Sequence, residues 1–184
     1  MVNSIRNVVR FVALANLSYF CIEFYFAQKI GSISLFADSI DFLEDASVNI
    51  LIFIAIGWSL AARVWLSKFL ALLLLVPAIS VVVSIIYEIS NPSAPDAISL
   101  TAVGFGALVV NSSCALLLAK FRSDKKSLVL AAYLSARNDA LANLAIITAG
   151  VITIFWASAM PDLLVGVAIG ALNADAALKV WRSA

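Results

Sequence analysis

Charged residues are scarce in this sequence, and histidine is absent altogether. Of the 184 residues only 12% are Asp, Glu, Lys or Arg, whereas 64% are hydrophobic. A soluble domain carries roughly 25% charged residues, and a soluble core of this size could not use so much apolar surface. The remaining apolar surface must face lipid, so the composition predicts an integral membrane protein.

Other absences narrow the class further. The net charge is +1 and no basic run has interleaved aromatic residues, so we expect no nucleic-acid partner. The two cysteines, Cys21 and Cys114, lie in apolar runs, which favours buried thiols over a disulfide. With no histidine in the chain and no cysteine expected as a ligand, we expect a metal site to consist of oxygen ligands.

Long apolar runs are what the chain does contain. A membrane-spanning helix needs about 20 mostly apolar residues. The segments that qualify cover about 11–27, 34–62, 69–89, 97–119, 128–157 and 163–180. Turn-like connections lie at 31–32, 91–95 and 160–162. We therefore expect an all-α membrane protein, a bundle of six transmembrane helices in one domain over residues 1–184, without a soluble domain.

The positions of Lys and Arg predict the orientation of this bundle. If the N-terminus is cytoplasmic, ten basic residues fall on the cytoplasmic side, Lys29 falls outside and Arg137 lies within a span, which accounts for all 12. Cytoplasmic loops of membrane proteins carry such an excess. We expect both termini in the cytoplasm and the protein in a bacterial inner (plasma) membrane.

Acidic residues occur inside two of the predicted spans. In the second span, Asp38, Asp41 and Asp45 fall within roughly 60° of one another on the helix. A charge at the bilayer centre costs about 2.5–3.5 kcal/mol, and carboxylates this close repel unless a cation or a proton lies between them. A divalent metal, or protons that replace it, would meet that need.

The fifth span carries a similar stripe at four-residue spacing, formed by Ser135, Asp139 and Asn143. The matching positions of the second span are Asp41, Asp45 and Asn49. Polar residues inside spans usually face a bundle interior or an ion pathway. The two stripes therefore predict a shared cation site between the second and fifth spans.

Three motifs resemble one known family. Residues 31–41, followed by Asp45, resemble the second-helix signature of the cation diffusion facilitators. Residues 137–143 are similar to the fifth helix of small members that lack the C-terminal cytoplasmic domain, and residues 161–166 resemble the start of the sixth helix. The resemblance implies not an enzyme but a homodimeric exporter of divalent transition-metal ions in exchange for protons. Carried over by position, its metal ligands are Asp41, Asp45, Ser135 and Asp139.

The chain departs from that family at Ser135, where His or Asp is usual. Asn138 is an alternative oxygen donor, although it lies roughly 100° from Asp139 around the helix. An all-oxygen site favours harder ions such as manganese, with iron, cobalt and zinc still open. We expect such an ion as the substrate and no resident cofactor.

Further polar residues are candidates for the surroundings of the site or the ion path. They are Asp38, Asn49, Asn138 and Asn143, together with Asn16 and Glu23, which lie seven apart on one face of the first span. Asn16 and Glu23 could equally join helices. Two other functions stay open. One is a membrane protein that binds metal or acts as a scaffold without transport. The other, which we disfavour, is a metal-dependent membrane phosphotransferase.

Overall fold

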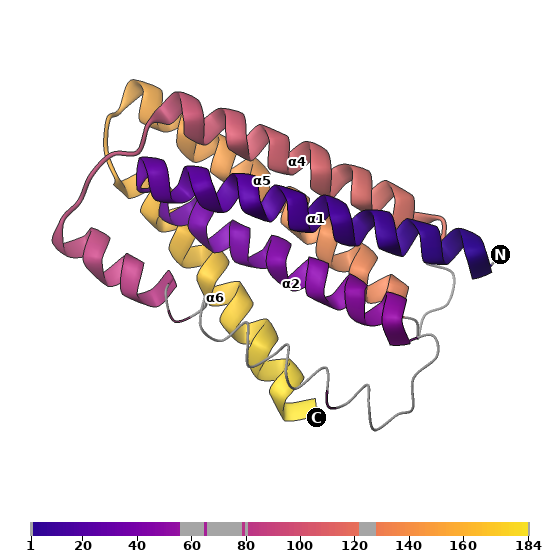
Figure 1. The fold of residues 1–184 in the computed structure, drawn as a ribbon. Coiled ribbons are helices and arrows are strands. Elements are labelled where there is room, and N and C mark those ends of the chain that lie inside the picture. The colour runs from indigo at the N-terminus through magenta and orange to yellow at the C-terminus, as the bar shows by residue number, and fades with distance from the viewer. Residues whose placement is uncertain (1, 56–64, 66–78, 80, 122–127, 184) are drawn as a thin grey trace.

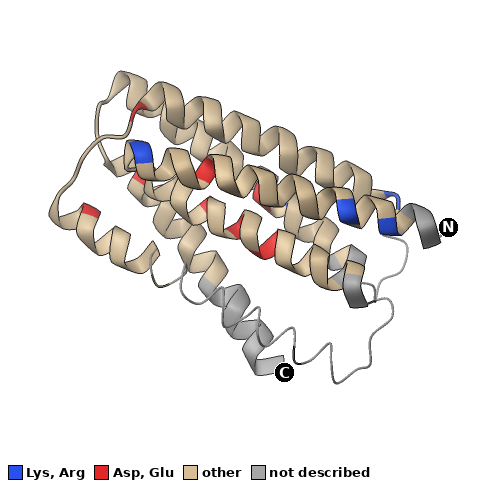
Figure 2. Ribbon diagram, in the orientation of Figure 1, with Lys and Arg blue, Asp and Glu red and all other residues tan. Residues whose placement is uncertain are grey.

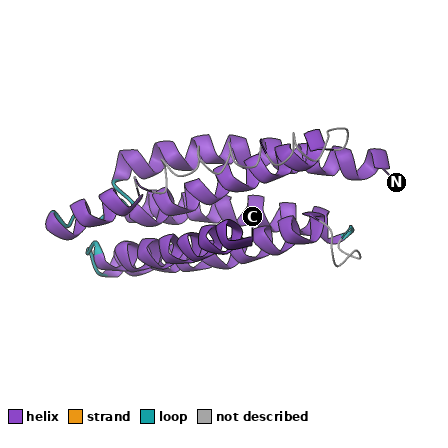
Figure 3. Ribbon diagram, turned by 90° about the horizontal axis from the view of Figure 1, so that it is seen from below, coloured by secondary structure: helices purple, strands orange, loops and turns teal. Residues whose placement is uncertain are grey.

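The structure, a computed structural model, describes residues 2–55, 65, 79, 81–121 and 128–183. Within these residues the regular structure is entirely α-helical, with short loops between the helices (Figures 1 and 3). The labelled helices are α1 (Val2–Ile30), α2 (Ile33–Ala55), α4 (Ala97–Ala119), α5 (Leu128–Phe155) and α6 (Met160–Ser183). A further helical segment spans Val81–Ser90. The expected all-α fold is confirmed.

Helix α2 lies at the centre of the bundle. It packs against α1, α5 and α6, while α4 packs chiefly against α5 and α1. Figure 1 shows α1 and α2 running side by side along the length of the molecule. A side chain on α2 can therefore reach α1 and α5 at once, which is what a site built from several helices requires.

A tight turn makes α1 and α2 antiparallel. Gly31 ends α1 with φ of 69°, a left-handed conformation that glycine adopts without steric cost. The backbone N–H of Ser32 then donates to the carbonyl of Ala27 at 3.0 Å, the bond that closes a Schellman-type helix end. The turn predicted at residues 31–32 is confirmed, and it fixes the register between the two helices.

Asp162 ties the start of α6 to the start of α2. Its carboxylate accepts hydrogen bonds from Ser32 Oγ (2.7 Å), the Ile33 backbone N–H (2.7 Å) and both donors of Ser34. Residues 160–162, predicted as a turn, are instead the first turn of α6, and the connection from α5 lies at 156–159. A proline is compatible with a first helical turn, because the N–H groups there have no helical partner.

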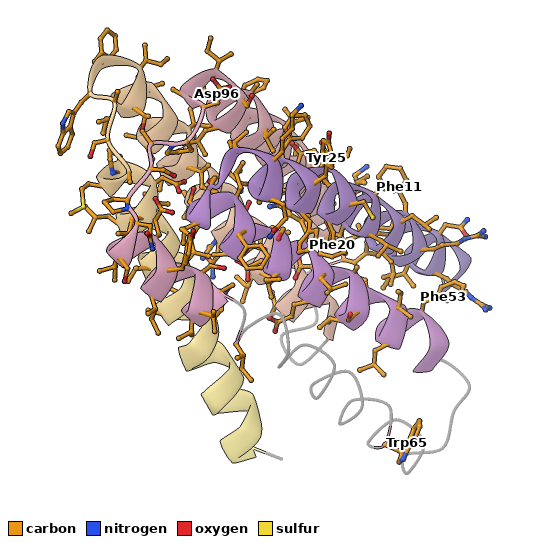
Figure 4. All side chains as sticks on the ribbon, turned by 60° about the vertical axis from the view of Figure 1, so that its left-hand side comes forward. Phe11, Phe20, Tyr25, Phe53, Trp65 and Asp96 are labelled. Carbon is orange, nitrogen blue, oxygen red and sulfur yellow. The ribbon has the colours of Figure 1, made fainter. Side chains whose placement is uncertain are left out.

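The outer surface of the bundle is apolar. Phe155 is 86% exposed, Ile98 74% and Leu116 72%, which is typical of side chains that face lipid tails. In Figure 4, Phe11 and Tyr25 project outward from α1. The buried face of α4 instead carries small and polar residues such as Gly104, Ala107 and Asn111, and these let α5 pack closely.

Among the residues that the structure describes, three helices qualify as membrane spans by length and composition alone: Ile5–Ile30, Ala97–Ala119 and Ala132–Phe155. Helix α2 is 23 residues long, but it carries four acidic residues. The end of the predicted second span (56–62) and most of the predicted third span lie outside the described residues, apart from Ile79 and 81–89. The protein is thus an integral membrane protein in which α2 carries an unusual number of acidic residues.

Candidate cation site

Asp45 lies where three helices meet. Its side chain is 6% exposed and stands on α2, between α1 and α5. Ser135 of α5 donates its hydroxyl to Asp45 Oδ1 at 2.9 Å, and Asn16 of α1 donates its amide to Oδ2 at 3.5 Å. Each carboxylate oxygen is therefore held by a different neighbouring helix, so the carboxylate has a defined orientation in the core.

Asp139 and Asp41 lie next to this carboxylate. Asp139 follows Ser135 by one turn on α5 and interacts with both Ser135 and Asp45. Asp41 precedes Asp45 by one turn on α2, and the charges of Asp139 and Asp45 act on it. Both acids are partly buried. The structure thus brings the four residues carried over from the family resemblance into one region between α2 and α5.

A second polar layer lies further along the same helices. Asn143 of α5 donates its amide to Asp38 Oδ2 on α2, and Asn143 Oδ1 in turn accepts from Asn111 of α4 at 3.0 Å. Glu23 of α1 is near enough for its carboxyl group to interact with Asp38. All four side chains are buried.

The two layers use the same four helices. In the first layer, Asn16 also accepts a bond at 3.7 Å from Cys114 Sγ of α4. Each layer therefore holds a polar group from α1, α2, α4 and α5. On both α1 and α2, seven residues separate the two layers, which is about 10 Å at 1.5 Å per residue. Because these two helices are antiparallel, Asn16 lies level with Asp45, and Glu23 lies level with Asp38.

The acids of the two layers have no basic neighbours among the described residues. Arg6 lies over the Phe53 ring, Lys29 lies near the Tyr25 and Phe26 rings, and Arg137 donates to Asn138. Figure 2 shows acidic residues along α1 and α2, with the basic residues of α1 nearer its two ends. Buried carboxylates without a countercharge are costly, so this region has a strong preference for cations or protons.

Asn138 and Asn49, two of the residues predicted at or around the site, make contacts other than those expected. Asn138 is exposed and accepts from Arg137 at 3.3 Å, so the structure does not bring it to Asp45. Asn49 is buried one turn beyond Asp45, but its amide donates back to the Asp45 carbonyl at 2.8 Å. Asn49 therefore stabilises α2 locally, and its side-chain oxygen has no donor partner in the described part of the chain.

No three Asp, Glu, Cys or His side chains in the described residues are arranged so that they could hold a metal ion as they stand. Asp45 instead accepts the hydrogen bonds of Ser135 and Asn16. Oxygen coordination of a divalent ion would need the carboxylates of Asp41, Asp45 and Asp139 to converge on one point and the Ser135 hydroxyl to present its lone pairs. Carboxylates can hold protons, and a divalent ion binds only their ionised forms.

Sequence reasoning missed two members of these layers. Asn111 lies in the middle of an otherwise apolar span, and that isolated amide was the signal for an interhelical contact. Cys114, expected to be a buried small side chain, is indeed buried and free, and it also donates to Asn16, which no pattern in the sequence indicates. Cys21 is free but exposed, so the expectation that it is buried was wrong for this residue.

One family model matches the chain. Its description is the cation efflux transmembrane domain, and it matches residues 9–184, which is nearly the full length. A search of curated proteins gave no match.

Proposed function

Since the chain belongs to the cation efflux family, we propose that this divalent cation transporter exchanges metal ions for protons at Asp41, Asp45, Asp139 and Ser135. The observation that carries the proposal is the position of Asp45. It is buried between three helices, accepts hydrogen bonds from α1 and α5, and interacts with Asp139. No described basic residue neutralises this group of acids.

The exchange follows from the chemistry of carboxylates. A divalent ion binds ionised carboxylates, so metal binding releases protons and proton binding releases the metal. Both states place positive charge among the acids, which makes either state more favourable in lipid than the bare anions. An all-carboxylate site can thus couple the two ions directly, without a separate proton relay.

The ion is expected to be a hard or borderline divalent metal. Three carboxylates and a hydroxyl offer only oxygen ligands, which favour manganese over zinc or copper. Iron, cobalt and zinc follow as weaker substrates. We propose export from the cytoplasm, on the basis of the family resemblance.

The wider arrangement is part of the same proposal. We infer six transmembrane helices with both termini in the cytoplasm of a bacterial inner membrane, because ten of the 12 basic residues then lie on the cytoplasmic side. The working unit is a homodimer. Alternating access would tilt α2 and α5 relative to their neighbours, and thereby open the site between them to one side at a time.

The test is ion flux in proteoliposomes. The purified chain is reconstituted with an inward or an outward proton gradient and offered manganese, iron, cobalt, zinc and cadmium in turn. We expect flux that reverses with the gradient and is largest for manganese. Asp45→Ala and Asp139→Ala should abolish flux.

Asp96→Asn serves as the matched control, because Asp96 is an exposed acid at the start of α4 (Figure 4). Its flux should equal that of the wild-type chain. Absence of flux for every ion, with the control folded, would reject transport. Metal binding without flux would then favour the alternative of a binding or scaffolding protein.

A further inference from the structure

Glu23 is a buried acid that the proposed exchange site does not use. Its side chain is 0% exposed, and no donor within the described residues reaches Oε1 or Oε2. It stands on α1, a helix apolar enough to span a membrane. An ionised carboxylate in this position would be strongly destabilising, so Glu23 requires a positively charged partner or a proton.

Asp38 of α2 faces Glu23. The two carboxyl groups lie within hydrogen-bond reach of each other, and Asp38 is also 0% exposed. Asn143 donates to Asp38 Oδ2, whereas Asp38 Oδ1 has no donor in the described part of the chain. Together the two residues present three buried carboxylate oxygens without a donor, and we call them the Glu23–Asp38 pair.

The Glu23–Asp38 pair lies beside the exchange site, one turn before Asp41 on α2, and its charges act on those of Asp41 and Asp139. Asp38 precedes Asp45 by seven residues on α2, and Glu23 follows Asn16 by seven on α1. Along the helix axes, the pair is therefore about 10 Å from Asp45 and Asn16, and about 4.5 Å from Asp41. The pair lies toward the end of the bundle where Asp162 joins α6 to the start of α2.

The side chains around the pair hold it in place. Asn111 donates to Asn143 at 3.0 Å, so the amide of Asn143 is oriented toward Asp38. On α1, Tyr19 stands one turn before Glu23 and donates its hydroxyl to the Val103 carbonyl, which fixes the ring between α1 and α4. Neither Asn143 nor Tyr19 neutralises charge, so the pair still needs a cation or a proton.

We propose that the Glu23–Asp38 pair binds a second divalent cation, in line with the ion held at Asp45. One shared proton would pair two of the three unpartnered oxygens and leave the third without a partner, whereas a divalent ion coordinates all three at once. The identity of the ion as the transported metal rests on the proposed function; the existence of the site does not. Two positions in line would form a path through the bundle.

Counting bound ions tests this inference. The full-length chain in detergent is equilibrated with Mn²⁺, and separately with Cd²⁺, and bound metal is measured by dialysis and mass spectrometry. We expect two ions per wild-type chain and two for Asp96→Asn. Glu23→Gln, Asp38→Asn and Asp45→Asn should each lose one ion, and Glu23→Gln combined with Asp45→Asn should lose both.

A measurement on the wild-type chain alone covers the case in which a variant fails to fold. Electron paramagnetic resonance should find two coupled Mn²⁺ ions within about 10 Å of each other. A single bound ion that only Asp45→Asn removes would overturn the inference and leave a proton-sharing pair. If Glu23→Gln binds one ion fewer while the wild-type chain transports no metal, the second site is upheld and the proposed transport is rejected.

Discussion

The hydroxyl of Ser135 donates a hydrogen bond to Asp45 across 2.9 Å, joining α5 to α2. The serine therefore has a role even before any ion is considered, because it orients one oxygen of a buried carboxylate. When a cation binds Asp45, the same hydroxyl can rotate and offer a lone pair. Ser135 is thus suited to both states of the proposed exchange, although it is a weaker ligand than His or Asp.

Removing this hydroxyl should weaken transport without abolishing it. A hydrogen bond to a charged group is worth about 1.5 kcal/mol or more, so Ser135→Ala should lower kcat/KM for manganese about tenfold. Initial flux in proteoliposomes over a range of metal concentrations gives the value. Flux equal to that of the wild type would show that Ser135 neither binds the ion nor orients the Asp45 carboxylate.

Replacing Ser135 by a better ligand should change the preferred ion. Imidazole nitrogen suits zinc more than manganese, so Ser135→His should raise zinc flux relative to manganese flux. Competition between the two ions in the same liposomes measures the ratio. Thr148→His is the matched control, because Thr148 stands on the exposed face of the same helix. An equal shift in both variants would contradict a ligand role for position 135.

Periodicity along a single helix is enough to predict that Asp41 and Asp45 share a face, and that Ser135, Asp139 and Asn143 share another. The structure places both sets between α2 and α5. What periodicity cannot supply is the rotation of one helix against the next. The bonds from Asn16 to Asp45 and from Asn143 to Asp38 depend on that rotation, so no spacing predicts them.

Asp162 shows a different limit of sequence reasoning. The sequence predicts a turn at 160–162, yet Asp162 is 2% exposed and accepts hydrogen bonds from Ser32 and Ser34, more than 120 residues away in the chain. Its bonds arise only because the start of α6 reaches the start of α2. Such contacts come from tertiary packing and leave no local pattern.

The start of α4 should show a measurable dependence on pH. Asp96 caps the helix, and hydrogen bonds from Ser99 lower the pKa of Asp96 below its ordinary value of 3.8. Because the folded-state pKa is depressed, the stabilisation is fully present above pH 3.8 and is lost as pH falls through the lowered pKa.

Asp96→Ala should therefore lower Tm in detergent at pH 7, and the difference from the wild type should shrink below pH 3.8. Thermal unfolding, monitored by circular dichroism at pH 7 and below pH 3.8, measures the Tm difference and its change with pH. Asp96→Asn keeps an oxygen that accepts from Ser99 and should depend less on pH. A constant difference between Asp96→Ala and the wild type at all pH values would show that the carboxylate is not the source of the effect.

The contact between α6 and α2 leaves no space for a side chain at Gly166. A Cβ there would lie 2.9 Å from the backbone carbon of Ile33 and 2.9 Å from the backbone nitrogen of Ser34. Backbone atoms cannot move aside as a flexible side chain can, so α6 would have to shift away from α2 and from the bonds made by Asp162. Gly166→Ala should therefore destabilise the fold by about 1–3 kcal/mol.

Gly170, one turn further along α6, provides the comparison. A Cβ at Gly170 would lie 3.6 Å from Val81 Cγ1, an ordinary contact. Alanine is also favoured over glycine inside a helix by about 1 kcal/mol, so Gly170→Ala should keep or raise Tm while Gly166→Ala lowers it. Thermal unfolding of the two variants in one detergent decides the matter. Equal Tm values would mean that α6 does not need its close approach to Ile33 and Ser34.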